Sequence, residues 1–376
     1  MSKIKIMTVV GTRPEIIRLS EVIKELDKMA DHVLVHTGQN YDYELNEIFF
    51  KNLGLKKPDY FLDAAKGKPS ETVGNILIKI DPILEKEKPE AFLILGDTNS
   101  CMAAYAAKRR KIPVFHMEAG NRCFDARVPE ELNRGIVDRM SDINIVYSDL
   151  ARLNLVREGF LSDRIIKSSS PMKEVLDKNS KQIEDSNILK ELDLKEGDYF
   201  VFSSHREENI NIDKNFDAII EIANKIAEKY SKPVIFPAHP RTKKKIDDNN
   251  LKLNNNIKII KPLGFFDFVK LEKNALCTLS DSGTISEESS ILNFQAVNIR
   301  EAHERPEAMD ETSVIMSGLN SDRVLQAIEA AVAQQKGEKR DFNMPNDYNI
   351  SNVSKKIYRI ILSYTDYIKR VNWLEK

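Results

Sequence analysis

The N-terminal half of the chain alternates short apolar runs, rich in β-branched residues, with amphipathic segments. The runs IKIMTVV, HVLVHTG, AFLILGD and IPVFHMEAG are separated by segments such as EIIRLSEVIKELDKM, in which apolar residues recur at helical spacing. Runs such as AFLILG and INIVYS are continuously apolar, which is typical of parallel strands that helices cover on both faces. This alternation predicts βαβ units and an α/β fold with a doubly wound parallel sheet.

A second α/β domain follows a break in this alternation. The stretch from Lys173 to Glu196 is polar, and strand-like and helix-like segments resume near Tyr199 with DYFVFSS, FDAIIEIANKIAEKY and PVIFPAHPR. The C-terminal segment carries an apolar stripe at helical spacing, so we expect a last helix that docks on another part of the chain. Ligands of open α/β sheets bind at the carboxyl ends of strands, so we expect the site in a cleft between the two domains.

Length and composition agree with this organisation and exclude several classes of protein. At roughly 150 residues per domain, a chain of 376 residues suggests two domains. A content of 41% hydrophobic and 31% charged residues excludes wholesale disorder and fibrous architectures. The net charge of −1 gives no general attraction to nucleic acid or to anionic membranes, so we expect neither as a partner.

The sequence lacks the features of secreted, membrane-spanning and metal-binding proteins. Its first residues, MSKIKIMTVV, lack the apolar length and cleavage site of a signal peptide, and no stretch reaches the ~18 apolar residues of a membrane span. We therefore expect a cytoplasmic protein. Three scattered cysteines, Cys101, Cys123 and Cys277, form no CxxC pair, so we expect neither a disulfide framework nor a bound metal.

The segment GTRPE, which contains Arg13, directly follows the first apolar run and opens the first amphipathic segment. Backbone N–H groups at such a helix start can bind an anion, although a simple turn with a solvated arginine explains the segment about as well. Neither GxGxxG nor GxxxxGK[ST] is present, so we expect no nicotinamide or other cofactor.

A second candidate anion site lies in SDSGTISEE, where the run ALCTL ends and a helix is expected to begin. Ser282, Gly283 and Thr284 can offer backbone donors and hydroxyl groups to a diphosphate. Glu288, about one turn further, can accept hydrogen bonds from the two hydroxyls of a ribose. A capping box is an equally good interpretation, because Ser or Thr followed by Glu is a frequent helix start.

Carboxylates follow two neighbouring apolar runs. Asp97 follows LILG and Glu118 follows VFHM, while Glu130 and Glu131 lie in RVPEELNR, where Pro129 can start a helix. Acids at the carboxyl ends of adjacent strands meet at one edge of a sheet and suit acid–base catalysis. Favourable interaction with a helix dipole explains Glu130 and Glu131, but not Asp97 and Glu118.

Histidine and arginine follow the first apolar run of the second domain, in His205-Arg206. They can bind anions or transfer protons near neutral pH, and we interpret His239 and His303 as further strand-end positions. A single histidine is more often structural than catalytic. Three of them at equivalent places favour a functional role.

Together the motifs GTRPE, HTGQNYD, GDTNS, HMEAG, FDARVPEELNR, SSHREEN, SDSGTISEES and HERPE, in this order, resemble the non-hydrolysing UDP-N-acetylglucosamine 2-epimerase family. The resemblance spans nearly the whole chain. Segments such as GNRCFDARVPEE, SSPMKEVL and NIREAHERPEAMDE look like the branch that converts UDP-2-acetamido-2,6-dideoxy-L-talose to UDP-N-acetyl-L-fucosamine. The ordinary N-acetylglucosamine branch more often has GLR in place of Gly120-Asn121-Arg122.

The resemblance implies two Rossmann-like domains facing across a cleft, at 1–172 and 173–353, as in the glycosyltransferase-B class. The last helix, at 354–376, would cross back to the first domain, and the protein would be a homodimer. Its ligands would be a UDP-sugar substrate and UDP. The residues matching catalytic positions of the family are Asp97, Glu118, Glu130 and His205. The expected substrate-binding residues are Arg13, Arg18, Gln39, Arg134, Arg206, Ser282, Gly283, Thr284, Glu288 and Arg305.

Two positions depart from the pattern of better-known members. Arg18 stands where a lysine is common, which keeps the charge and alters the donor geometry. Gln39 matches a site at which substrate activates bacterial relatives, but Asp42 replaces a longer amide or acid there. We therefore do not expect activation by substrate.

The chemistry of C2 inversion narrows the mechanism, because the hydrogen at C2 of a nucleotide sugar is not acidic. Expulsion of UDP from C1 as C2 loses its proton gives a 2-acetamidoglycal, to which UDP adds back with protonation of the opposite face. This route needs groups that stabilise the leaving diphosphate and an acid–base group on each face. A UDP-sugar glycosyltransferase, a hydrolysing epimerase and a UDP-sugar sensor are the competing interpretations.

Overall fold

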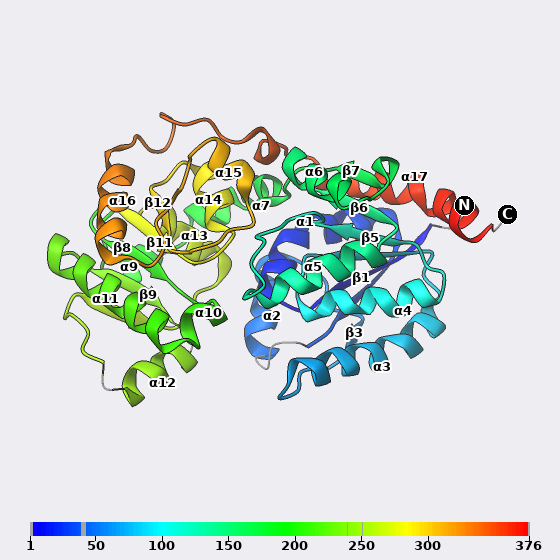
Figure 1. The fold of residues 1–376 in the computed structure, drawn as a ribbon, viewed down its shortest axis with the longest axis horizontal. Helices are drawn as coiled ribbons and strands as arrows, with labels where there is room; N and C mark the ends of the chain where they lie inside the picture. The colour runs from blue at the N-terminus through cyan, green and yellow to red at the C-terminus, as the bar shows by residue number, and fades with distance from the viewer. Residues whose placement is uncertain (1–2, 39–42, 239, 250, 375–376) are drawn as a thin grey trace. The chain divides into compact units, whose positions relative to one another are not determined.

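The computed structural model describes residues 3–38, 43–238, 240–249 and 251–374. The chain forms two compact units, one of residues 1–177 and 350–376 and the other of residues 178–349. The limits expected from the sequence, after residue 172 and before residue 354, differ slightly from these. Each unit is a parallel sheet with helices on both faces (Figure 1).

The first unit contains a seven-stranded parallel sheet with the strand order β3-β2-β1-β4-β5-β6-β7. Val9 of β1 pairs with Val35 of β2 on one side and with Ile94 of β4 on the other, so the strand order reverses between β1 and β4. The strands are β1 (Lys5–Val10), β2 (Asp31–His36), β3 (Tyr60–Phe61), β4 (Ala91–Leu95), β5 (Val114–Met117), β6 (Ile143–Val146) and β7 (Ile165–Lys167).

Helices cover both faces of this sheet. Helices α3, α4 and α5 bury apolar side chains against one face, and α1 packs beside the C-terminal helix α17 (Figure 1). The helices of this unit are α1 (Arg13–Met29), α2 (Tyr43–Asn52), α3 (Pro69–Glu87), α4 (Ala103–Arg109), α5 (Pro129–Met140), α6 (Asp149–Arg157), α7 (Met172–Lys178, whose last residue belongs to the second unit) and α17 (Val353–Trp373).

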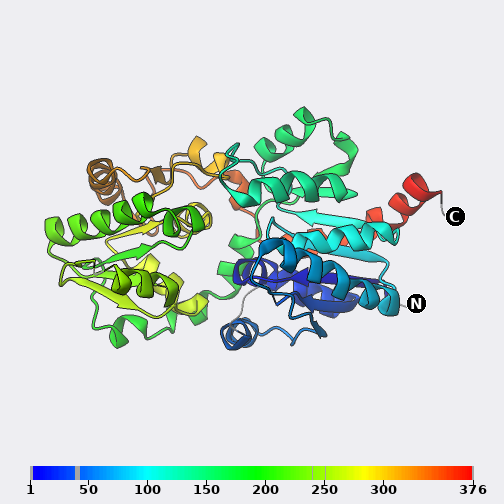
Figure 2. The same cartoon turned by 60° about the horizontal axis from the view of Figure 1, so that its bottom comes forward.

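Helix α17 docks on the first unit through its apolar stripe, with Ile357, Ile361 and Ile368 fully buried. Its first turn is fixed by the Glu174 carboxylate, which accepts hydrogen bonds from the backbone N–H of Ser354 at 2.8 Å and from its hydroxyl at 2.6 Å. The end of the chain is thus part of the first unit (Figure 2).

The second unit contains a six-stranded parallel sheet with the order β10-β9-β8-β11-β12-β13, and the order reverses between β8 and β11. Alternate residues of β8 face opposite layers. Phe200 and Phe202 pack under α11 and α16, whereas Tyr199 and Val201 pack under α9 and α13. The strands are β8 (Phe200–Ser203), β9 (Val234–Pro237), β10 (Ile257–Ile260), β11 (Cys277–Ser280), β12 (Ala296–Asn298) and β13 (Ile315–Met316).

The polar stretch before β8 is largely helical, because a few apolar side chains within it reach a core. Ile183 and Ile188 are buried although most of their neighbours are exposed. The helices of this unit are α8 (Ser180–Glu184), α9 (Ile188–Glu191), α10 (Glu207–Ile210), α11 (Asp213–Tyr230), α12 (Pro240–Asp248), α13 (Phe265–Lys273), α14 (Ile285–Leu292), α15 (Pro306–Asp310) and α16 (Ser321–Ala333).

The part of the chain that the structure describes contains neither a membrane-spanning helix nor a metal-binding cluster. No helix within it is both long and apolar enough to cross a membrane. The same residues contain no group of three or more histidine, cysteine, aspartate or glutamate side chains placed to hold a metal ion.

Candidate functional site

Most of the candidate residues lie where the strand order of a sheet reverses. In the first unit, GTRPE follows β1 and Asp97 follows β4 closely; in the second, His205 and Arg206 follow β8 and the SDSGT loop follows β11. Loops at such a position diverge to opposite faces of the sheet and leave a crevice at the carboxyl ends of the strands. Both sheets therefore present their polar motifs where α/β proteins bind ligands.

The loop after β1 is packed too closely to carry a side chain at Gly11. A Cβ atom there would lie 2.0 Å from Ser100 Oγ and 2.2 Å from Thr37 Oγ1. These two hydroxyls are themselves hydrogen-bonded at 2.9 Å. The glycine thus allows the β1 loop to rest directly on the 3₁₀ turn Asn99–Met102 that follows β4.

Glu15 joins these two loops, and sequence reasoning did not assign it a role. Its buried carboxylate accepts hydrogen bonds from the backbone N–H groups of Gly11 at 2.5 Å and Thr12 at 3.2 Å, and from the Thr98 hydroxyl. Burial raises the pKa of Glu15 from 4.5 to about 7, although these hydrogen bonds oppose the shift. Its neighbour Arg13 lies with its guanidinium 5.4 Å from the centroid of the Phe49 ring.

Glu118 directly follows β5 and forms an ion pair with Arg18 from α1. Because Leu95 of β4 pairs with Met117 of β5, Asp97 and Glu118 leave neighbouring strands at the same edge of the sheet. The backbone of Glu118 has φ of 69°, in the left-handed region that side chains other than glycine adopt at a cost. Such strain concentrates at functional sites.

Asp97 is held by Arg134 from α5. The guanidinium donates from Nε to Asp97 Oδ2 at 2.7 Å and from Nη1 to Glu131 Oε2 at 2.7 Å. Glu131 also accepts hydrogen bonds from the backbone N–H groups of Cys123 at 3.1 Å and Phe124 at 3.0 Å. Arg134, predicted to bind substrate, therefore contacts a predicted catalytic carboxylate.

Glu130 and Glu131 both occupy the first turn of α5, but their surroundings differ. Glu131 organises the loop at 121–125, which the dipole interpretation alone does not explain. Glu130 is partly exposed beside it. Asn133, one turn further along, donates from Nδ2 to the backbone oxygen of Asp97 at 2.8 Å, which fixes α5 against the β4 loop.

In the second unit, Asp281 organises the loop that carries His205 and Arg206. Its fully buried carboxylate accepts hydrogen bonds from Ser204 Oγ at 2.8 Å, from the two backbone N–H groups of His205 and Arg206 at 3.1 Å, and from Asn209 Nδ2 at 2.9 Å. Burial alone would raise the pKa of Asp281, but His205 and these hydrogen bonds outweigh it and lower the pKa. Asp281 belongs to the SDSGT motif, in which only Ser282, Gly283 and Thr284 were expected to bind a ligand.

Arg206 projects beside the SDSGT loop and is bound by Glu304. Its Nη2 lies 2.9 Å from Glu304 Oε1, while Arg300 Nη1 lies 2.6 Å from Glu304 Oε2. A Cβ atom on Gly283 would lie 3.2 Å from Glu304 Oε1. Glycine thus brings backbone close to the Arg206–Glu304 pair, and Glu304 is a site neighbour that sequence reasoning missed.

The start of α14 does not form the capping box that the sequence left as an alternative, because Thr284 makes no side-chain capping hydrogen bond. The Ser282 and Thr284 hydroxyls instead bond to each other at 2.9 Å. Glu288 lies in the first turn of the helix and is 5% exposed. Burial, with Glu288 nearby, raises the pKa of Glu272 well above its ordinary value.

The remaining predicted residues lie in different settings. Arg305 is buried, and its Nε lies 3.6 Å from Glu287 Oε2. Glu307, two residues further along the chain, accepts a hydrogen bond from the Tyr348 hydroxyl at 2.9 Å. His303 is not at a strand end, because β12 ends at Asn298 and His303 lies in the loop before α15. That prediction is wrong. Gln39, Asp42 and His239 lie outside the described residues.

Comparison with known proteins shows which protein family this chain belongs to. Residues 24–362 match the family model described as UDP-N-acetylglucosamine 2-epimerase. The chain belongs to the UDP-N-acetylglucosamine 2-epimerase family. It is therefore an isomerase of the UDP-sugar 2-epimerase class.

Individual relatives cover almost the whole chain. A structure described as UDP-N-acetylglucosamine 2-epimerase from Rickettsia bellii is 49% identical, with a TM-score of 0.92 over 99% of this chain and 100% of that one. The Methanocaldococcus jannaschii UDP-GlcNAc 2-epimerase, solved in complex with UDP-GlcNAc and UDP, is 36% identical, with a TM-score of 0.88 over 96% and 100%. A UDP-2,3-diacetamido-2,3-dideoxy-D-glucuronate 2-epimerase from Pseudomonas aeruginosa is 32% identical over 88% of this chain and 93% of its own length.

These matches confirm the predicted family and the prediction of two parallel-sheet α/β domains of the glycosyltransferase-B-like kind. They favour the epimerase over the glycosyltransferase interpretation. The relatives' names also differ in the sugar they specify, so the family covers more than one UDP-sugar.

Proposed function

We propose that this chain inverts C2 of a UDP-2-acetamido sugar by eliminating UDP and adding it back. The observation that carries the proposal is the placement of Asp97 and Glu118 at the ends of neighbouring strands, each carboxylate paired with a buried arginine. Held in this way, two carboxylates can serve as a base and an acid without large movement.

The bonds change as follows. In the first half-reaction the C2–H and C1–O bonds break, a C1=C2 double bond forms and UDP leaves as an anion. In the second half-reaction UDP oxygen attacks C1 while a proton reaches C2 from the opposite face, so no oxidant or reductant is consumed. We assign Glu118 to proton transfer at C2 and Glu130 to tuning or relay, with Asp97 as the further acid–base group.

Binding of the UDP moiety is assigned to the loops of the second unit, with Arg13. The Ser282, Gly283 and Thr284 segment at the start of α14 supplies backbone and hydroxyl donors for phosphates, and Glu288 accepts from the ribose. His205 and Arg206, fixed through Asp281 and Glu304, stabilise the leaving diphosphate.

For the sugar we propose UDP-2-acetamido-2,6-dideoxy-L-talose, which would give UDP-N-acetyl-L-fucosamine for a capsule or O-antigen polysaccharide. The support is the GNRCFDARVPEE segment, together with the contacts that it makes. Cys123 Sγ lies 3.3 Å from Glu131 Oε2 and 3.5 Å from Arg134 Nη1. The segment that differs between the branches therefore contacts Arg134, the arginine that holds Asp97. We further propose a cytoplasmic homodimer.

The second candidate reaction is conversion of UDP-N-acetylglucosamine to UDP-N-acetylmannosamine. The names of the relatives from M. jannaschii and R. bellii favour it. Binding residues for UDP and the carboxylates are common to both reactions, so the two differ only in which sugar the site accepts.

Proton NMR in deuterated water tests the proposal, with each UDP-sugar supplied separately and no acceptor or cofactor added. Deuterium at C2 of an L-fuco product from the L-talose substrate alone would support the proposed sugar. Exchange and conversion with UDP-N-acetylglucosamine alone would replace it with the second candidate. Accumulation of free sugar and UDP, or no exchange with either sugar, would contradict the proposed mechanism.

A further inference from the structure

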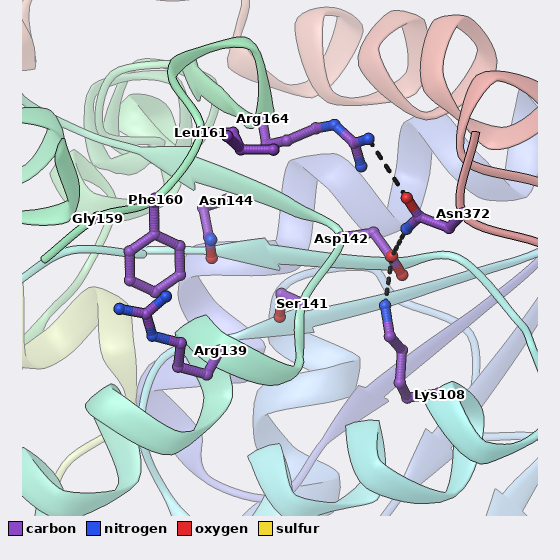
Figure 3. Close-up of a pocket in the computed structure, with 10 residues that line it drawn as sticks. All are labelled: Lys108, Arg139, Ser141, Asp142, Asn144, Gly159, Phe160, Leu161, Arg164 and Asn372. Atoms are coloured by element: carbon purple, nitrogen blue, oxygen red, sulfur yellow. Dashed lines mark hydrogen bonds and ion pairs between the residues drawn. The ribbon is translucent and has the colours of Figure 1, made fainter.

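A cavity of about 210 Å³ opens at the edge of the first sheet away from Asp97 and Glu118 (Figure 3). Asp142, in its wall, precedes β6 and accepts a hydrogen bond from the backbone N–H of Val114, the first residue of β5, at 3.0 Å. Glu118 follows the last residue of that strand, and a strand of this length spans about 13 Å. The cavity is therefore separate from the site described above.

Three basic side chains contribute to the polar lining of this cavity. Lys108, Arg139 and Arg164 line it together with one carboxylate, Asp142. That carboxylate is fully buried and already occupied: it pairs with Lys108 and accepts from Asn372 Nδ2 at 2.7 Å as well as from Val114. Lys108 neutralises it, and Asp163, outside the lining, pairs with Arg164 at 3.4 Å, so the excess positive charge of the cavity comes from Arg139.

Both guanidinium groups lie over aromatic rings, and the hydrogen bonds of the described residues use only part of their N–H groups. The Arg139 guanidinium lies 4.0 Å from the centroid of Phe160, and that of Arg164 lies 5.2 Å from the centroid of Tyr367. Each has five N–H donors. Within the described residues, Arg139 donates to the backbone oxygen of Glu158 and Arg164 donates from Nη2 to Asn372 Oδ1 at 3.3 Å.

Two buried polar atoms in the wall lack hydrogen-bond partners among the described residues. One is Nε of Arg164, although Asp163 Oδ2 lies 3.4 Å from it. The other is Oδ1 of Asn144, a residue that is 1% exposed and whose Nδ2 donates to the backbone oxygen of Asp138 at 3.2 Å. Figure 3 shows the Asn144 amide between Phe160 and Ser141 in the cavity wall. A buried acceptor without a donor is costly, so a ligand that brings a hydroxyl would be favoured.

We propose that this cavity binds a small phosphate monoester. The planar donor edges of Arg139 and Arg164 match the oxygens of a phosphate, and Asn144 accepts from a hydroxyl of the attached group. The volume suits a ligand up to about the size of a monosaccharide phosphate and is too small for a dinucleotide. The site lies outside the residues assigned to the epimerase reaction.

The contacts of Arg164 also tie α17 to the sheet, since Asn372 bridges Arg164 and Asp142. If the cavity residues had a purely structural role, changing their charge would not alter phosphate binding. Variants are therefore compared by ligand binding: Arg164→Gln removes one guanidinium, and Asn372→Asp adds a carboxylate at an exposed position beside it. Arg157→Gln removes the same charge from the exposed end of α6, outside the cavity, and serves as the control.

The experiment is calorimetric titration of full-length protein saturated with UDP, with inorganic phosphate and with glucose 6-phosphate as probes at up to about 10 mM. We expect the wild type and Arg157→Gln to bind alike, and Arg164→Gln and Asn372→Asp to bind at least about fivefold more weakly. Tighter binding of glucose 6-phosphate supports a phosphate monoester, while equal binding leaves a site for free phosphate and overturns the monoester.

Three outcomes would overturn the site itself: no binding by the wild type, equal weakening in Arg157→Gln, or unchanged binding in both cavity variants. Asn372→Asp keeps the test decisive if Arg164→Gln does not fold. The comparison between variants does not depend on whether UDP occupies the proposed substrate site. Failure of the phosphate-site proposal is therefore distinguishable from failure of the epimerase proposal.

Discussion

Arg18 of helix α1 forms an ion pair with Glu118, which lies 100 positions further along the chain. The Arg18 side chain is 4% exposed and that of Glu118 is 11% exposed, so little water screens the pair. The arginine therefore holds the carboxylate at the end of β5, in the strained backbone conformation noted above. Arg18, predicted to contact substrate, has at least this second task of positioning Glu118.

Glu118→Gln is expected to lower turnover by about 100-fold or more and to abolish deuterium incorporation at C2. Glutamine keeps the size and polarity of the side chain but cannot accept and return a proton, and general acid–base groups contribute about that much. The NMR assay on the folded variant measures both quantities. Arg18→Lys, which keeps the positive charge, is the matched control and is expected to lose less activity. Near-normal turnover of Glu118→Gln would remove Glu118 from proton transfer.

The sequence reveals those parts of the site that are set by neighbouring residues along the chain, and does not reveal those that depend on tertiary packing. Asp97, Glu118 and His205 were found because each follows an apolar run, and a strand end is visible in the sequence. Arg18 and Arg134 were expected to bind substrate, but their pairing with Glu118 and Asp97 was not predicted. Arg18 and Glu118 meet only because α1 and β5 pack in one unit, and no local pattern encodes that distance.

The features that the sequence left open or misplaced have similar physical reasons. The stretch before β8 reads as polar because its helices bury only single side chains, such as Ile183 and Ile188, and are otherwise solvated. His303 looked like a strand-end residue because β12 is only three residues long and its limit has no clear signal. Burial of Glu15 needed two loops to close over one carboxylate, which composition cannot show.

Gly11→Ala is expected to destabilise the first unit by about 1–3 kcal/mol, the usual cost of overpacking a filled interior. The added Cβ would overlap Ser100 Oγ and Thr37 Oγ1, so the β1 loop would have to move away from the β4 loop. Urea unfolding measures the change in free energy.

Gly74→Ala provides the control for that substitution. Gly74 lies inside α3, and a Cβ there would meet no atom within 4 Å. Alanine should therefore stabilise the protein by about 0.5–1 kcal/mol, because it favours the helix over the unfolded chain. If Gly11→Ala were as stable as Gly74→Ala, the close approach of the two loops would be refuted.

Glu15 should make the first unit lose stability as the pH rises. Its pKa is raised from 4.5 to about 7 in the folded protein, so the folded state binds more protons than the unfolded state between these values. The free energy of unfolding therefore falls with increasing pH in that window, by about 3 kcal/mol in total, and the stabilising effect is fully present below pH 4.5.

Glu15→Gln isolates this effect, because glutamine is neutral at every pH and can still accept hydrogen bonds from Gly11 and Thr12. The difference in unfolding free energy between wild type and variant should change between pH 4.5 and 7 and be level above that window. All other titrating groups cancel in the difference. A difference independent of pH would show that the Glu15 carboxyl is not shifted.

Asp281→Asn is expected to destabilise the second unit by about 2–3 kcal/mol, because the new NH2 group would face hydrogen-bond donors and leave at least one unpaired in a buried site. The donors are the Ser204 hydroxyl, the Asn209 amide and the backbone of the His205–Arg206 loop. Urea unfolding monitors the loss, and UDP affinity should fall with it because the loop is no longer fixed. Asp198→Asn, which removes an exposed carboxylate paired with Lys232, is the control and should change stability little.

The pH dependence of this variant runs opposite to that of Glu15→Gln. The pKa of Asp281 is lowered from 3.8 in the folded protein, so the ionised carboxylate stabilises the fold above that value and the benefit disappears as the pH falls through the lowered pKa. The gap between wild type and Asp281→Asn should thus be constant near neutral pH and narrow in acid. A gap that widens in acid would mean that burial, and not His205 with the surrounding donors, determines the charge state of Asp281.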